Sequence, residues 1–296
     1  MSAVVPPLAL FRRGKVREMY VVDDERLLMV ASDRVSAFDV VMAEPIPGKG
    51  RVLTALSAFW FRHTGGLVPN HLLAFETAKL PAAVSLFAAS VAERCLLVRR
   101  AERIDIECVV RGYLAGSAWA EYRRNGTVAG ERLPPGLVES QQLERPIFTP
   151  AIKAESGHDE NISRARLAAL VGEELALRLQ ELSLELYAAG VAHAESRGLI
   201  LADTKFEFGF VDGDIIVIDE LLTPDSSRYW PLDGYAPGGP QPSFDKQFLR
   251  DFLQLQLQLQ LESGGWNKEP PPPPLPAAVI EGTAARYEEA LKRLTA

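Results

Sequence analysis

The stretch LADTKFEFGF at residues 201–210 constrains the fold more than any other part of the sequence. Charged and apolar residues alternate in it, and residues two apart in a strand share a face. One face carries Asp203, Lys205 and Glu207, whereas the other carries phenylalanines and is the expected core side. The following VDGDIIVIDE places Asp-Gly between two apolar runs, a strong signal for a tight turn. We therefore predict a hairpin whose charged face lines water, a partner or a site.

The register of this hairpin decides which acid of the return strand reaches the charged face. A three-residue turn sets Glu207 opposite Asp219. A two-residue turn sets Glu220 opposite Lys205. Two opposed carboxylates repel each other unless a cation lies between them, and Mg²⁺ is commonly held by one or two carboxylates together with substrate phosphates. A solvated face with ion pairs across the strands is the alternative.

The composition is that of an ordinary globular protein, because 47% of the 296 residues are hydrophobic. A net charge of -7 argues against a nucleic-acid surface, which needs clustered lysines and arginines. Cys95 and Cys108 lie in apolar runs without metal-ligand spacing, so we expect reduced core residues. No secretory signal pattern is present, and no apolar run approaches the roughly 20 residues that span a bilayer. We expect a cytoplasmic protein without nucleic-acid or membrane partners; the oligomeric state stays open, a homo-oligomer included.

Three parts are expected along the chain. Residues 1–100 contain short strands and one helix, and form a β-rich lobe with a phosphate-binding turn. Residues 101–232 form a mixed lobe, in which a strand leads to a helix near Ser117 and residues 163–197 have helical spacing. Residues 233–296 form a helical C-terminal segment with five consecutive prolines, which we expect to be extended polyproline.

The repeat FLQLQLQLQLES in the last part alternates leucine with glutamine, a pattern that formally favours a strand. We prefer a helix, because FDKQFLRDFL enters the repeat with helical spacing and Asp245 is a candidate cap. The final AAVIEGTAARYEEALKRLTA has the pattern of an amphipathic helix.

Two basic motifs suit bound anions. In RRGKVREMY, Gly14 stands at a turn followed by Lys15 and Arg17 on one strand face, which suits a phosphate chain through exposed N–H groups and positive charges. The motif is neither the Walker loop nor the dinucleotide fingerprint, and an ordinary basic edge strand is the alternative. In ECVVRGYLAGS, Arg111 ends a strand and Ser117 begins a helix. This arrangement is typical of an anion pocket or of a simple N-cap beside a surface arginine.

Two polar loops supply the remaining candidate residues. They are Asp33, Ser36 and Asp39 in SDRVSAFD, and His158, Asp159 and Asn161 in SGHDEN. No Ser-His-Asp order or Cys-His pair supports nucleophilic catalysis, and a lone loop histidine more often organises its loop than transfers a proton. Paired acids, a basic glycine turn and separate arginines together favour phosphoryl chemistry on ATP, by a kinase or by a ligase.

Seven stretches, in their order along the chain, resemble the family of SAICAR synthetases (phosphoribosylaminoimidazole-succinocarboxamide synthases). The most specific are IECVVRGYLAGSAW and LADTKFEFG; the others are GKVREMY, SDRVSAFDVVMAEPIPGKGRVLT, FTPAIKAESGHDENIS, DELLTPDSSRYW and GWNKEPPPP. The family passes from FLRDFL to GWNKEP within a few residues, so QLQLQLQLES is an expansion that leaves the motifs untouched.

The resemblance implies an α+β fold related to ATP-grasp enzymes and kinases. It also implies an ATP-dependent ligase of purine biosynthesis, which condenses the carboxylate of carboxyaminoimidazole ribonucleotide (CAIR) with the amine of L-aspartate through an acyl phosphate. The products are SAICAR, ADP and phosphate, the implied cofactors are ATP and Mg²⁺, and the implied partners are the small molecules CAIR and L-aspartate. A small-molecule kinase of the same superfamily is the main alternative, and a nucleotide-binding regulatory module is the second.

Roles for the candidate residues also follow from the resemblance. Gly14, Lys15 and Arg17 are expected at the ATP phosphates, and Leu97, Val98, Arg99 and Arg100 beside the adenine. Glu207 and Asp219 are the expected Mg²⁺ ligands, with Asp203 and Lys205 as catalytic support. Arg111, Ser117 and Arg228 are expected to bind the phosphate and carboxylate of CAIR. Asp33, Ser36, Asp39, His158, Asp159 and Asn161 belong to loops expected to close over CAIR and aspartate.

Overall fold

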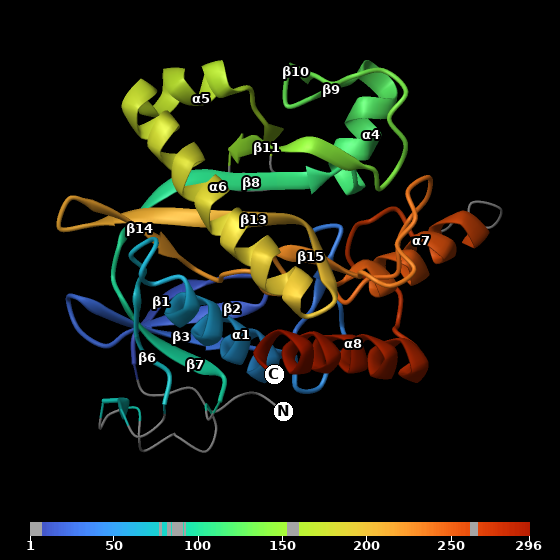
Figure 1. Cartoon of the computed structure of the whole chain (residues 1–296). Coiled ribbons are helices and arrows are strands. Elements are labelled where there is room, and N and C mark those ends of the chain that lie inside the picture. Colours follow the sequence, from blue (N-terminus) through green and yellow to red (C-terminus); the bar gives the residue numbers. More distant parts are fainter. Residues whose placement is uncertain are drawn as a thin grey trace. The chain divides into compact units, whose positions relative to one another are not determined.

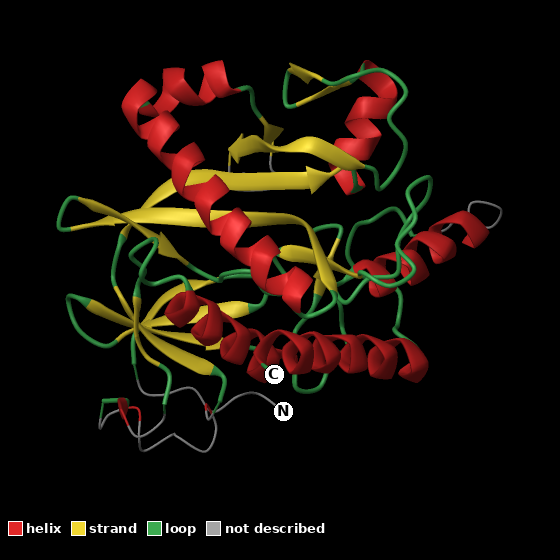
Figure 2. Cartoon of the chain, in the orientation of Figure 1, coloured by secondary structure: helices red, strands yellow, loops and turns green. Residues whose placement is uncertain are grey.

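Two compact units make up the chain in the computed structural model, which describes residues 8–76, 79–81, 84, 91, 93–152, 160–260 and 266–296. Unit 1 takes in Met1–His63, Asn70–Glu102 and Phe244–Ala296, and unit 2 takes in Thr64–Pro69 and Arg103–Ser243. Each unit combines sheets with helices, which confirms the expected α+β class (Figures 1 and 2). No helix in these ranges is long and apolar enough to cross a membrane.

Unit 1 is built on a five-stranded antiparallel sheet of order β1-β2-β3-β7-β6. Its strands are β1 (Leu10–Arg13), β2 (Arg17–Val21), β3 (Arg26–Ala31), β7 (Cys95–Arg99) and β6 (Leu72–Ala74). A separate pair is formed by β4 (Ser36–Ala37) and β5 (Val40–Val41). Helix α1 (Lys49–His63) packs on β3 and β7, because Leu53, Leu56 and Trp60 present one apolar face at helical spacing.

The C-terminal helices α7 (Gln247–Gln260) and α8 (Ala277–Thr295) also belong to unit 1. The preference for a helix over the Leu-Gln repeat is confirmed as far as Gln260. Leu249 and Leu253, four residues apart, are both fully buried. The carboxylate of Asp245 accepts a hydrogen bond from the N–H of Gln247 at 2.5 Å, as a cap does. The Pro270–Pro271 peptide is cis.

Unit 2 is built on a sheet of order β12-β11-β8-β13-β14, and β15 also pairs with β13. Its strands are β12 (Glu160–Asn161), β11 (Gln142–Ile152), β8 (Glu102–Tyr113), β13 (Leu199–Val211), β14 (Asp214–Ile218) and β15 (Ser227–Pro231). A small hairpin is formed by β9 (Thr127–Val128) and β10 (Glu131–Arg132).

Three helices accompany this sheet, namely α4 (Gly116–Asn125), α5 (Arg164–Val171) and α6 (Glu173–Ser196). The helical spacing predicted over 163–197 is confirmed, with a break at Gly172, whose φ of 88° ends one helix and precedes the next. Helix α6 packs on β13 and β11 (Figure 1). The division into three parts at residues 100 and 232 stays a prediction.

Candidate functional site

An arginine cluster, which we define as Arg111, Ser117, Asp203 and Arg228, lies at one end of the central strands of unit 2. Arg111 extends from β8 and places its Nη1 3.2 Å from Oδ2 of Asp203 on β13. Arg228 on β15, paired with Asp203 in the strand register, donates to the same carboxylate oxygen. Both partners of the Arg111–Asp203 ion pair are buried. A single carboxylate thus lies between two guanidinium groups.

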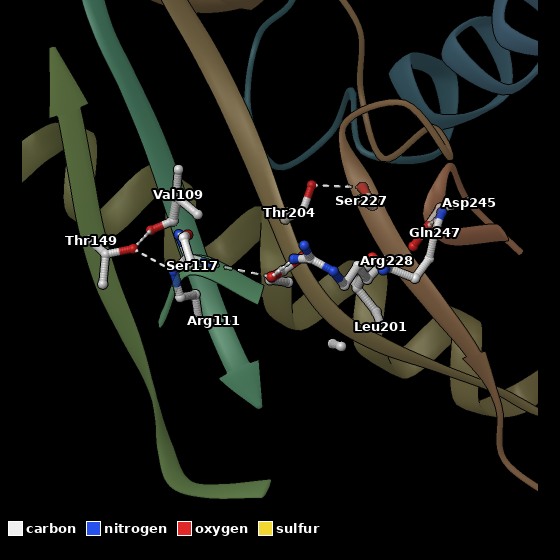
Figure 3. Close-up of polar contacts among 12 residues, drawn as sticks. Val109, Arg111, Ser117, Thr149, Leu201, Thr204, Ser227, Arg228, Asp245 and Gln247 are labelled. Carbon is white, nitrogen blue, oxygen red and sulfur yellow. Dashed lines mark hydrogen bonds and ion pairs between the residues drawn. The ribbon is translucent and has the colours of Figure 1, made fainter. Parts of the chain in front are cut away.

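The hydrogen bonds of Arg111 fix its orientation (Figure 3). Its Nε donates to Oγ1 of Thr149 on β11 at 3.0 Å, and its Nη2 donates to Oγ of Ser117 at 3.2 Å. Ser117 stands in the first turn of α4, where unpaired N–H groups and the helix dipole make the surroundings positive. Arg111 and Ser117, singled out in the sequence as a pair, are therefore in direct contact.

Positive charge exceeds negative charge in the arginine cluster. Burial lowers the pKa of Arg111, the charge of Asp203 raises it, and the charge of Arg228 lowers it again. The guanidinium of Arg228 lies against Gly116, whose φ is +56°, and an added Cβ there would come within 2.4 Å of Nη2. The glycine thus lets the guanidinium approach the start of α4. Two guanidinium groups, a hydroxyl and a helix N-terminus are groups that bind phosphate or carboxylate.

An acid cluster, which we define as Glu107, Lys205, Glu207 and Glu220, lies further along the same two strands. Nζ of Lys205 on β13 is 2.7 Å from Oε1 of Glu107 on β8. Burial lowers the pKa of Lys205, but the charges of Glu107, Glu207 and Glu220 outweigh burial, and the pKa is raised overall. The three acids are all buried. One ammonium thus opposes three carboxylates, and the negative excess suits a cation.

The hairpin between β13 and β14 has the two-residue turn Asp212-Gly213, because Val211 pairs with Asp214. Both turn residues have positive φ, 54° and 88°, as the Asp-Gly type I′ turn requires. Glu207 therefore lies opposite Ile218, and the alternative register with Glu207 facing Asp219 is wrong. The register that forms is the one for which Glu220 is expected opposite Lys205. The negative charge of Glu220 raises the pKa of Lys205.

Asp219 follows the last residue of β14, is half-buried and has a φ of 65°. Within the described ranges, no group of three or more His, Cys, Asp or Glu side chains has the arrangement of a metal site. Oxygen donors from Glu207 and Asp219 nevertheless fit Mg²⁺, which often takes only one or two carboxylates and completes its shell with phosphate oxygens and water. The negative excess of the acid cluster agrees with this donor set.

The candidate phosphate turn of unit 1 joins β1 and β2. The N–H of Gly14 donates to the carbonyl of Arg17 at 2.8 Å, so the exposed N–H expected at this glycine is used within the turn. Lys15 forms an ion pair with Asp39, and both side chains are largely exposed. Arg17 is half-buried and lines a small recess together with residues of β3 and α1, among them Thr54 and Ser57.

The predicted adenine segment lies mostly inside the sheet of unit 1. Leu97 and Val98 pair with β3 on one side and β6 on the other. The N–H of Arg99 donates to His71 and that of Arg100 to Glu25, at 2.8 and 2.7 Å. The exposed end at Arg100 is thus the part of this segment that is open to solvent.

The polar loops take different places. Oδ1 of Asp33 accepts a hydrogen bond from the N–H of Gly50 at 2.9 Å and so caps α1. Ser36 is half-buried on β4. Asn161 lies on β12 opposite Ala151. His158 and Asp159 lie outside the described residues.

Two polar contacts of the site were not predicted. Glu107 interrupts the apolar run IDIECVV four residues before Arg111, hence on the same strand face, and this spacing is the signal that could have identified it. Thr149 has no comparable signal, because only the pairing of β11 with β8 brings it to Arg111.

Comparisons with known proteins agree over nearly the whole chain. The family profile described as SAICAR synthetase matches residues 10–263. The phosphoribosylaminoimidazole-succinocarboxamide synthase of Desulfosudis oleivorans is 53% identical over 290 residues, covering 98% of this chain and 96% of that protein.

Solved structures show the same fold. The SAICAR synthase of Saccharomyces cerevisiae complexed with SAICAR is 45% identical and superimposes with a TM-score of 0.84, covering 97% of this chain and 95% of that one. A SAICAR synthetase in complex with ADP, 23% identical, has a TM-score of 0.69 and covers 97% of each chain.

Proposed function

Because the chain belongs to the SAICAR synthetase family, we propose that it is the ATP-dependent ligase that condenses CAIR with L-aspartate. The observation that carries the substrate assignment is the arginine cluster. CAIR carries a phosphate and a carboxylate, and two guanidinium groups that share one carboxylate at a helix N-terminus suit a ligand with two anionic groups. A kinase acting on a neutral alcohol has no use for this cluster.

The reaction has two balanced steps. A carboxylate oxygen of CAIR attacks the γ-phosphorus of ATP, the bond to the β-phosphate oxygen breaks, and ADP leaves. The amine of L-aspartate then attacks the acyl carbon, phosphate leaves with the electron pair of the C–O bond, and the amine loses a proton. Each step brings anions together, so positive side chains must lower their repulsion. Arg111 and Arg228 hold CAIR, with Ser117 donating to the same ligand.

We assign to Lys205 the stabilisation of the charge that develops on the reacting carboxylate. Its raised pKa keeps the ammonium protonated at neutral pH, and Glu107 fixes its position through the 2.7 Å contact. Asp203 orients both guanidinium groups of the arginine cluster. Lys205 therefore has an electrostatic role and Asp203 a positioning role.

Glu207 and Asp219 are the proposed ligands of Mg²⁺. When bound, the ion would neutralise charge on the phosphates of ATP and favour loss of ADP. The negative excess of the acid cluster, to which Glu207 belongs, supports a cation beside Glu207.

Unit 1 is assigned to the nucleotide. Lys15 and Arg17 are the proposed phosphate contacts. Arg100 is the exposed end of the predicted adenine segment. Asp39, which pairs with Lys15, would exchange that contact for a substrate contact. The proposal places the reaction in the cytoplasm.

Omission of each substrate in turn tests the reaction. Purified protein with Mg-ATP, CAIR and L-aspartate is expected to release ADP and phosphate in equal amounts with SAICAR, and to release neither when any one substrate is missing. ADP release without aspartate, with phosphate transferred to an alcohol, would identify a kinase.

Arg228→Gln tests the substrate assignment. The variant is expected to raise KM for CAIR by about 10- to 100-fold, because a charge-assisted contact is lost. KM for ATP should stay near the wild-type value. The exposed Arg197→Gln on the same unit is the matched control.

A further inference from the structure

Tyr187 of α6 places its hydroxyl between the two strands that carry the arginine cluster. The side chain is buried, with 2% of its surface exposed. The hydroxyl donates to the carbonyl of Leu201 on β13 at 2.7 Å and lies against the backbone of Gly112 on β8. Gly112 follows Arg111 directly in the sequence. One side-chain oxygen thus joins β8 and β13 next to the cluster.

The space for this hydroxyl depends on glycine. A Cβ on Gly112 would lie 2.1 Å from Oη of Tyr187, and no side chain other than hydrogen can be accommodated there. Neighbouring residues of a strand point to opposite faces of the sheet. Because Gly112 faces α6, the side chain of Arg111 points to the other face.

The strand β13 is irregular at the same level. Its pairing with β15 shifts between Leu201 and Asp203, which leaves Ala202 as an additional residue. In a regular strand Leu201 and Asp203 would share a face. Here Leu201 contacts α6, where a Cβ on Gly190 would come within 2.9 Å of its Cδ2, whereas Asp203 turns to Arg111. The bulge therefore reverses the direction of Asp203.

We propose that Tyr187 is a positioning residue for binding of CAIR, an inference that rests on the proposed function. Its hydroxyl donates to the carbonyl of Leu201 at the bulge and occupies the space beside Gly112, next to Arg111. Without the hydroxyl the buried carbonyl loses this donor, and the contact that connects the two strands at this level is lost. The strands then shift, and the shift moves Arg111 and Asp203 relative to each other.

Tyr122 supplies a matched control. Its hydroxyl donates to the carbonyl of Pro134 at 2.7 Å and accepts from the N–H of Leu137 at 3.1 Å. The side chain is buried on α4, five residues beyond Ser117, but its partners lie in the loop after β10. Tyr187→Phe and Tyr122→Phe each remove a hydrogen bond from a buried hydroxyl to a backbone carbonyl, and only the first of these joins the strands of Arg111 and Asp203.

Calorimetric titration of the full chain with CAIR, and separately with inorganic phosphate, tests the inference. Tyr187→Phe is expected to weaken the binding of both by about tenfold, while Tyr122→Phe binds them as wild type does. The two variants should lower the melting temperature similarly, and Mg-ATP should bind equally to both. Wild-type affinity in Tyr187→Phe, or equal losses in the two variants, would overturn the proposal.

Two further measurements test the role of Tyr187 if the wild type is inactive or if the variant does not fold. If the wild type makes no SAICAR, the proposed function fails, and the phosphate titration still compares the two tyrosines. If Tyr187→Phe does not fold, hydrogen exchange in the wild type replaces it. Saturation with CAIR or phosphate should slow exchange of the Gly112 amide about tenfold and leave the Leu137 amide unchanged. Equal responses of the two amides would contradict a role for Tyr187.

Discussion

The arginine cluster and the acid cluster both take residues from β8 and β13, and they have opposite charge balance. In the first, two guanidinium groups share the carboxylate of Asp203. In the second, the ammonium of Lys205 opposes three carboxylates. Arg111 and Glu107 are four residues apart on one face of β8, or about 13 Å along the strand.

One pair of strands can therefore hold ligands of opposite charge at different positions. A buried ion pair with matched charges has no net charge to attract a ligand. A cluster with unequal charges keeps an electrostatic field that favours a counter-ion. The positive excess suits an anionic substrate and the negative excess suits a metal ion. Three substitutions and one alkylation measurement test this contrast.

Asp203→Asn would break the arginine cluster. It leaves two guanidinium groups, one of them fully buried, without their shared charge partner. We expect the free energy of unfolding to fall by roughly 3–5 kcal/mol, as for other buried ion pairs that lose one partner. Urea denaturation measures the change, and Asp233→Asn, at an exposed position of the same unit, should have almost no effect. An equally stable Asp203→Asn protein would show that the guanidinium groups do not depend on this carboxylate.

Glu207→Gln would test the acid cluster through its metal. Turnover should fall by about 100-fold or more, because a Mg²⁺ ligand is lost at a site where charge is stabilised. The melting temperature should change little, and the Mg²⁺ concentration needed for half-maximal activity should rise. Glu181→Gln, exposed on α6, is the control. Near-normal activity at low Mg²⁺ would remove Glu207 from the metal site.

Gly116→Ala separates backbone strain from contact with Arg228. Gly116 and Gly126 both have positive φ at the two ends of α4, but only Gly116 has a guanidinium against it. Either change to alanine should lower the free energy of unfolding by roughly 1–2 kcal/mol through the left-handed backbone. In calorimetric titration with inorganic phosphate, only Gly116→Ala should weaken binding. Equal binding by both variants would mean that the approach of Arg228 to the helix is unimportant.

Cys108 reports on the strand between the two clusters. Burial, with a smaller contribution from the charges of Glu107 and Glu207, raises the pKa of its thiol to about 12, against the neighbouring hydroxyl of Ser183, which lowers it. An unfolded thiol has a pKa of about 8.5. The stability provided by the neutral buried thiol is therefore complete below about pH 8.5 and is lost as the pH rises toward 12.

We expect Cys108 to resist alkylation by iodoacetamide at pH 8 in the native protein and to react after unfolding in urea. Mass spectrometry of peptides distinguishes it from Cys95, whose pKa is raised to about 11 by burial. Rapid alkylation of native Cys108 would show that β8 is exposed between the clusters.

Local patterns predicted much of the fold and part of the site. The two-residue alternation and Asp-Gly turn predicted the hairpin of β13 and β14, and the fully buried Phe206 and Phe208 confirm its core face. Arg111 and Ser117 are six residues apart, so a strand followed at once by a helix brings them together. The turn length, in contrast, was left open by the sequence, although Asp-Gly is typical of the two-residue turn that forms.

Which strands carry charge and where a helix begins can be predicted from the sequence, because these features depend on the chemistry of residues close along the chain. Which charges meet depends on the tertiary structure. Glu107 reaches Lys205 across 98 positions, and Arg228 reaches Asp203 across 25. Such contacts depend on strand register and on the additional residue at Ala202, which changes the face on which Asp203 lies. Both result from long-range pairing of strands, and no local pattern of residues specifies that pairing.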